Sequence, residues 1–133
     1  MKRRFLIGII SLIIVIGGAG TIFMAHNSGE FRKVRNMPIN EVDLSRVSDG
    51  TYEGDFSYGR FTYVVEVIVK DHRIENIKIL KNRDTGHAKK AEGVIKRVIQ
   101  AQSLKVDAIT GATTTSKTLL KAVENALAKA ISQ

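Results

Sequence analysis

The residues best suited to chemistry lie in one run of ten near the C-terminus, at positions 107–116 (DAITGATTTS). Five of the ten carry a side-chain hydroxyl, and Gly111 and Ala112 leave little side-chain bulk in the middle. Backbone amides can therefore approach a ligand closely there. At a helix start such hydroxyls usually act as N-caps, while the first-turn amides and the positive end of the helix dipole can bind a phosphate. Spacing alone leaves both interpretations open and slightly favours an ordinary cap.

The elements that must position this run are predicted by hydrophobic periodicity. Residues 51–56, 61–70 and 74–81 read as three strands of an antiparallel meander with short loops, and Gly54 and Gly59 suggest a bulge or a close approach by another segment. Residues 88–102 and 116–131 repeat apolar residues three and four apart, which predicts two amphipathic helices. We therefore expect an α+β fold: a small antiparallel sheet of three or more strands with two helices on one face.

An uncharged apolar stretch at residues 5–24 precedes all of these elements. As a helix it would be about 30 Å long, enough to cross a bilayer core. The basic tail at residues 1–4 predicts a cytoplasmic N-terminus and an extracytoplasmic remainder. A cleaved signal peptide is the competing interpretation, but its apolar region is normally shorter. The predicted organisation is a tail at 1–4, a single-pass anchor at 5–24, a stalk at 25–48 from which Val42, Leu44 and Val47 dock on the domain, and a domain at 49–133.

Composition excludes several classes of function. The chain of 133 residues has no cysteine, so disulfides and thiolate metal sites are excluded, and its three histidines show no metal-ligand spacing. The net charge of +8 includes the three basic residues of the tail, and the other bases are interleaved with acids. That pattern is typical of a solvated surface rather than a nucleic-acid site, and a domain outside the cytoplasm would not meet nucleic acid.

Residues 107–113 resemble the flavinylation motif of the FMN-binding domain family. That pattern is an Asp, two variable residues, Ser or Thr, Gly, Ala and Thr, followed by further hydroxyls and a helix. The domain is shared by the C subunit of the sodium-pumping NADH:quinone reductase, the G subunit of the Rnf complex and many small membrane-anchored proteins. The segments 49–54 and 101–107 also resemble the family, so the likeness extends over about residues 49–131.

The resemblance implies that Thr113 is joined through its hydroxyl to the phosphate of FMN by a separate flavin transferase that uses FAD. It implies that Asp107 is recognised during the transfer, although an Asp here can also form an Asx-type turn. Thr110 is interpreted as a turn or ligand hydroxyl, and Thr114, Thr115 and Ser116 as caps, one of which also touches phosphate. Gly111 and Ala112 keep the approach open.

The loop at residues 84–87 stands where the family has a loop of the flavin pocket, and Gly86 and His87 are its candidate contributors. His87 either contacts the isoalloxazine ring or is a solvated residue at a helix start. Three aromatics, Tyr52, Phe56 and Tyr58, are candidates for stacking on the ring, and at least one of them is expected to belong to the core.

Three functions are compatible with these observations. The favoured one is a membrane-tethered extracytoplasmic flavoprotein that carries electrons through covalent FMN to membrane-associated or quinone-linked partners, rather than a stand-alone enzyme. The second is a module that senses or binds FMN, or another phosphorylated ligand, non-covalently. The third is a docking subunit of a membrane redox complex without a flavin of its own.

Overall fold

A computed structural model describes residues 29–131, and the predicted anchor at residues 5–24 lies outside this part. The chain divides into two compact units, Met1–Lys33 and Val34–Gln133. Of the first unit only residues 29–33 are described, and they are helical. None of the helices within residues 29–131 is long and apolar enough to cross a membrane. The second unit contains every element discussed below.

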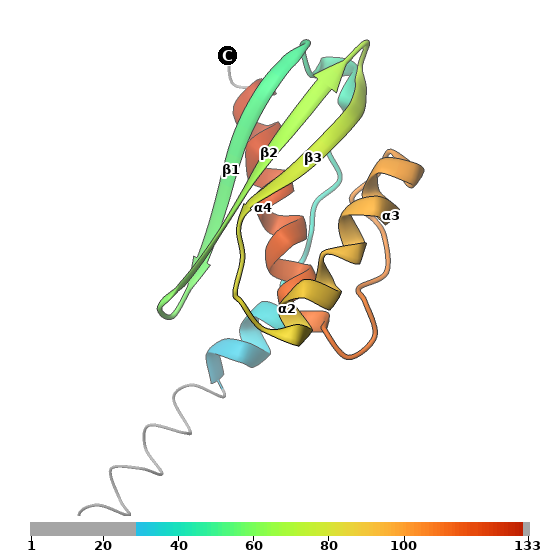
Figure 1. The fold of residues 1–133 in the computed structure, drawn as a ribbon. Helices are drawn as coiled ribbons and strands as arrows, with labels where there is room; N and C mark the ends of the chain where they lie inside the picture. The colour runs from blue at the N-terminus through green and yellow to red at the C-terminus, as the bar shows by residue number, and fades with distance from the viewer. Residues whose placement is uncertain (1–28, 132–133) are drawn as a thin grey trace, which may run out of the picture. The chain divides into compact units, whose positions relative to one another are not determined.

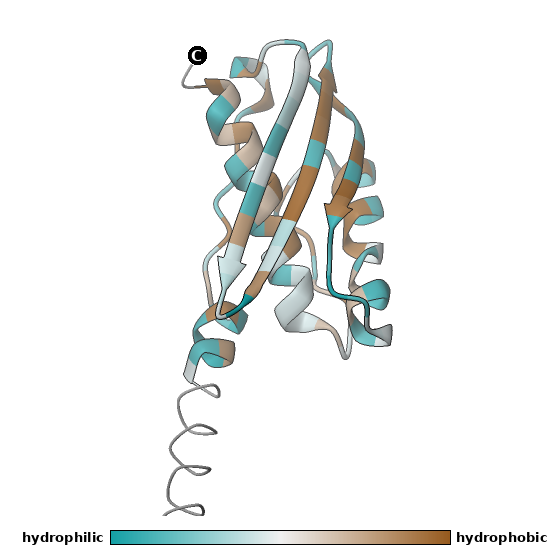
Figure 2. Cartoon of the chain, turned by 60° about the vertical axis from the view of Figure 1, so that its left-hand side comes forward, coloured by the Kyte–Doolittle hydropathy of each residue, from teal (hydrophilic) through white to brown (hydrophobic). Residues whose placement is uncertain are grey.

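Three antiparallel strands form the sheet, in the order β1-β2-β3. They span Gly50–Tyr58 (β1), Phe61–Lys70 (β2) and Arg73–Lys81 (β3), which confirms the predicted meander with a first strand three residues longer than expected. Side chains on one face of β2 are buried and alternate with more exposed ones, as the period of two predicts. The strand is hydrophobic over most of its length (Figure 2). The buried set is Tyr63, Val65, Val67 and Val69.

Helices cover the buried face of this sheet. The long C-terminal helix α4, Thr113–Ile131, packs on β1 and β2, and a shorter helix, α3, Gly93–Ala101, packs on β3 (Figure 1). The predicted apolar stripes are confirmed, because Val94 and Val98 on α3 and Leu119, Val123 and Leu127 on α4 are all at most 1% exposed. The fold is therefore α+β.

Gly54 of β1 lies where the strand touches the backbone of α4. A β-carbon at this position would lie 2.1 Å from the carbonyl oxygen of Ala122 and 2.4 Å from the amide nitrogen of Ala126. These separations are far inside van der Waals contact, so only glycine fits. The close approach predicted for Gly54 is confirmed, and Gly59 serves instead in the β1–β2 turn at φ 54°.

The helix predicted at residues 88–102 is in fact two helices, so residues 86–131 form three helices rather than two. The two that replace it are α2, Gly86–Ala91, and α3. Asn82 explains the break, because its Nδ2 donates to the Ala88 carbonyl (3.0 Å) and to the Glu92 carboxylate (2.8 Å). The Glu92 amide bonds to the Lys89 carbonyl instead, closing the first helix with a tighter turn. Gly93, a poor helix former, follows directly.

The segment before the sheet packs on the domain over much of its length. Residues Leu44–Arg46 form a short 3-10 helix, η1, which the Asp43 carboxylate caps by accepting from the Ser45 amide at 3.0 Å. Val47 is fully buried and Val42 and Leu44 pack partly against the core, as predicted. Val34 is also buried, so a stalk of limited order does not describe residues 34–48.

Candidate functional site

Helix α4 begins at Thr113, three residues earlier than predicted. The first helical bond joins the Ser116 amide to the carbonyl of Ala112 at 2.9 Å, so Ala112 stands at the N-cap position. Alanine has no side-chain acceptor for the first-turn amides. In the part of the chain that the structure describes, no side chain accepts from the amides of residues 113–115. The hydroxyl-rich run therefore contains a helix start without a side-chain cap.

The loop before α4 is held by two side chains from neighbouring helices. The buried Ser116 hydroxyl accepts from the Ile109 amide (3.1 Å) and donates to the Ala112 carbonyl (2.8 Å). The Arg97 guanidinium donates to the carbonyls of Asp107 (2.8 Å) and Ala108 (3.2 Å). These bonds fix the loop from both ends. The prediction that Ser116 caps the helix is wrong, because its hydroxyl bonds to loop backbone instead.

Gly111 adopts a left-handed conformation, with φ of 78°, in the turn that leads into the helix. This turn is closed by a bond from the Ala112 amide to the Ile109 carbonyl at 2.9 Å. A β-carbon at Gly111 would lie 3.7 Å from the ammonium of Lys90. Glycine is favoured by the conformation, and the turn brings a cation from α2 beside the helix start.

A cavity of about 270 Å³ opens at this helix start. Five consecutive residues of the motif, 111–115, line it together with His87 of α2 and Arg35 of the segment before the sheet. Thr113 and Thr114 are partly exposed in it, whereas Thr115 is buried. The structure thus brings together most of the predicted site residues in one hollow, with a free hydroxyl and positively charged groups around it.

Helix α2 carries His87 to this cavity. Its start at Gly86 is capped by the Thr85 hydroxyl, which accepts from the Ala88 amide at 3.2 Å. A bond between the exposed Asp84 and Lys89 spans the same turn at 2.8 Å and lowers the pKa of the Asp84 carboxyl. Gly86 itself is exposed and does not line the cavity.

Two further predicted site residues, Asp107 and Thr110, do not line the cavity at Thr113. Asp107 is exposed and lines a separate hollow of about 530 Å³ with Arg97 and Lys105. Among the described residues its carboxylate makes no hydrogen bond, so the Asx-type turn does not form. Thr110 is exposed in the same loop, outside the cavity at Thr113.

The three candidate aromatics belong to β1 and do not line the cavity at Thr113. Tyr58 is buried and stacks on Tyr63 with ring centroids 5.9 Å apart. Its hydroxyl accepts a hydrogen bond from the Tyr63 hydroxyl at 3.4 Å. Burial, followed by the hydrogen bond with Tyr63, raises the pKa of the Tyr58 phenol. The Tyr52 hydroxyl donates to the Ser48 carbonyl at 2.8 Å. Tyr58 is therefore a core residue, as expected of at least one of the three.

Sequence reasoning missed Arg35 and Lys90. Neither belongs to a motif, and Arg35 is far from Thr113 in the chain. Only the folded arrangement of the N-terminal segment and α2 brings them to the start of α4. Their positive charge was the one available signal, and the chain has 21 basic residues, so charge alone does not single them out.

The fold and the cavity define a small α+β domain with a hollow at the start of its C-terminal helix. Residues 58–128 match the family model of the FMN-binding domain, which is more than half of the chain. The chain belongs to the FMN-binding domain family and is a flavin-binding protein. No curated protein matches it.

Proposed function

We propose that this protein is a membrane-tethered extracytoplasmic flavoprotein that carries electrons through FMN joined by a phosphoester bond to Thr113. The observation that carries the proposal is the position of the Thr113 hydroxyl. It lies in the first turn of α4, partly exposed in a cation-lined cavity, in a domain of the FMN-binding family.

The residues around Thr113 suit the phosphate end of FMN. A phosphodiester keeps one negative charge, which uncapped first-turn amides and the helix dipole stabilise. Arg35, His87 and Lys90 add hydrogen-bond donors or positive charge, and none of the described residues that line the cavity carries a carboxylate. Gly111 and Ala112 leave the hydroxyl open to a flavin transferase.

The size of the cavity suits an electron carrier. Sites that enclose a whole ligand usually measure about 300–1,000 Å³, and this cavity is smaller. It would therefore hold the phosphate end of FMN and leave the isoalloxazine ring exposed to solvent. Bound flavin supplies one- and two-electron chemistry, while the protein supplies position and electrostatics. An exposed ring suits exchange with membrane-associated or quinone-linked partners.

Membrane attachment is supported by the apolar stretch at residues 5–24 and the basic tail before it. A covalent bond would prevent loss of the cofactor outside the cytoplasm. In the attachment step, the Thr113 hydroxyl oxygen bonds to the riboflavin-side phosphorus of FAD, AMP leaves, and the hydroxyl proton passes to solvent. The added mass on the chain is FMN less one water.

Co-expression with a flavin transferase, followed by fluorescence of the denatured band, tests the covalent bond. We expect a fluorescent band for wild type and for Thr114→Val, and a dark band for Thr113→Val. A dark wild-type band beside a fluorescent control flavoprotein would reject the ester.

Non-covalent FMN binding is the second candidate, favoured by the cationic groups that would hold a phosphate without an ester. Acid precipitation separates the two functions. Yellow colour released to the supernatant indicates non-covalent FMN, whereas colour kept in the pellet indicates the ester.

A further inference from the structure

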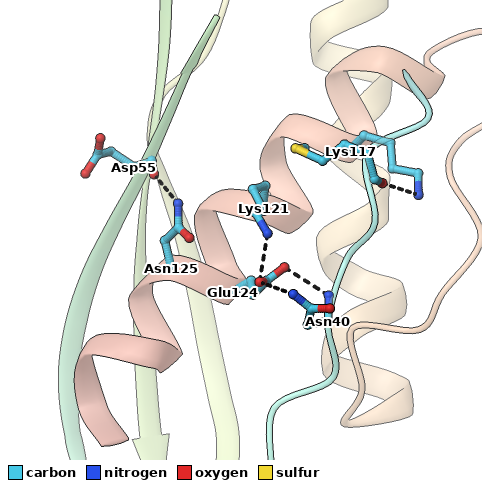
Figure 3. Close-up of polar contacts among 7 residues, drawn as sticks. Asn40, Asp55, Lys117, Lys121, Glu124 and Asn125 are labelled. Carbon is cyan, nitrogen blue, oxygen red and sulfur yellow. Dashed lines mark hydrogen bonds and ion pairs between the residues drawn. The ribbon is translucent and has the colours of Figure 1, made fainter. Parts of the chain in front are cut away.

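A segment ahead of the sheet, residues 34–41, is fastened to α4 at two places, and we call it the strap. The Lys117 ammonium donates to the carbonyl of Met37 at 3.2 Å. About two turns further along α4, the Glu124 carboxylate accepts hydrogen bonds from the backbone amide and the side-chain amide of Asn40, each at 3.0 Å (Figure 3). Lys117 and Glu124 thus hold the strap from the same helix that presents Thr113.

These fastenings determine where Arg35 lies. Val34 before it is 6% exposed and packs in the core, and the amide of Met37 after it bonds to the Val34 carbonyl at 3.2 Å. Arg35 therefore lies at the end of a helical turn, between the buried Val34 and the hydrogen-bonded amide of Met37. Its side chain lines the cavity with the residues of the first turn of α4.

Among the described residues that line the cavity, Arg35 carries a positive charge and none is acidic. Within residues 29–131, neither Arg35 nor Lys90 takes part in a hydrogen bond or ion pair through its side chain. Asp84, the acidic residue of the loop before α2, is paired with Lys89 at 2.8 Å. Residues 113–115, whose amides donate to no side chain in the described part of the chain, line the same hollow. Such an arrangement favours an anion that accepts several hydrogen bonds.

We propose that Arg35 is a phosphate-binding residue of the flavin site, so that the strap completes the site. The inference rests on the proposed position of the FMN phosphate at Thr113. A guanidinium can donate two parallel hydrogen bonds to phosphate oxygens and remains charged at all physiological pH values. The family model matches residues 58–128. Arg35 lies outside this range, so the match to the family does not itself predict the guanidinium at the site.

The test uses the full chain in detergent with Thr113→Val, which removes the ester and keeps the side-chain shape. FMN and riboflavin, which lacks the phosphate, are titrated by quenching of flavin fluorescence. Adding Arg35→Gln is expected to raise the Kd for FMN about tenfold and to leave the Kd for riboflavin unchanged. Arg46→Gln, an exposed arginine of η1, is the matched control and should change neither.

The inference is overturned if Arg35→Gln leaves the FMN affinity unchanged, or if it weakens riboflavin binding as much as FMN binding. It is also overturned if the Thr113→Val parent does not bind FMN. Arg35→Lys, which keeps the charge, should recover part of the affinity. The covalent bond is scored separately on wild type by the denatured band. If FMN affinity depends on Arg35 but the wild-type band is dark, the ester is rejected and the role of Arg35 is retained. If the wild-type band is fluorescent but FMN affinity does not depend on Arg35, the role of Arg35 is rejected and the ester is retained.

Discussion

Four consecutive hydroxyls at residues 113–116 have different environments. Thr113 and Thr114 open into the cavity, whereas Thr115 and Ser116 are buried against the domain. Only Ser116 bonds to the loop before the helix, and it satisfies one amide and one carbonyl there. The hydroxyl proposed to carry FMN is therefore positioned by a neighbour three residues later on the same helix.

Replacing Ser116 by alanine should lower the free energy of unfolding by about 1–3 kcal/mol, because the Ile109 amide loses its acceptor in a partly buried position. Urea denaturation of the full chain in detergent measures the change. Ser48→Ala removes an exposed hydroxyl and serves as the control. Equal stability of the two variants would show that the bonds of Ser116 do not hold the loop.

Gly54→Ala should destabilise the domain by about 1–3 kcal/mol or more, because the new methyl group overlaps the backbone of α4. The same denaturation experiment measures it. Gly86→Ala is the matched control, since nothing lies within 4 Å of its β-carbon, and it should be neutral or slightly stabilising. A neutral Gly54→Ala would contradict the close contact between β1 and α4.

At the scale of elements, α4 connects the parts of the domain. It packs on the sheet, presents Thr113 at its start and holds the strap through Lys117 and Glu124. Glu124 is 8% exposed and also accepts from the Lys121 ammonium at 2.8 Å. Burial alone raises the pKa of the Glu124 carboxyl, but the bonds from Lys121 and Asn40 outweigh it, so the net pKa lies below its ordinary value of 4.5.

This lowered pKa predicts an acid-sensitive fastening. A carboxyl whose pKa is lower in the folded state contributes stability above its unfolded pKa, and loses it as pH falls through the folded value. Glu124→Gln should therefore lower the free energy of unfolding by about 1–3 kcal/mol near neutral pH, and by less at a pH well below 4.5. Urea denaturation of both proteins at the two pH values checks this, and a pH-independent difference would contradict it.

The elements show what sequence can and cannot predict. The strands and the stripes on α3 and α4 follow from local periodicity, and all were predicted. The break between α2 and α3 was not, because it depends on Asn82 reaching the Ala88 carbonyl from the preceding loop. The motif placed Thr113 at a helix start, but its cavity also needs Arg35, which only packing of the strap brings there.

At the scale of the whole molecule, the proposal requires the domain and the tail to lie on opposite sides of a membrane. The absence of cysteine allows this to be tested directly. In intact cells, Ala128→Cys, at an exposed position on α4, should react with a membrane-impermeant maleimide, whereas Lys2→Cys should react only after lysis. Labelling of Lys2→Cys in intact cells, or protection of Ala128→Cys, would contradict the predicted topology.

The most direct test of the central claim locates the flavin on the chain. Trypsin should release residues 106–117, bounded by Lys105 and Lys117, which contain all four hydroxyls in question. After co-expression with a flavin transferase, fragmentation of this peptide should place a mass of FMN less one water on Thr113. Modification of another hydroxyl would contradict the claim. So would an unmodified peptide from cells in which a control flavoprotein is fully loaded with flavin.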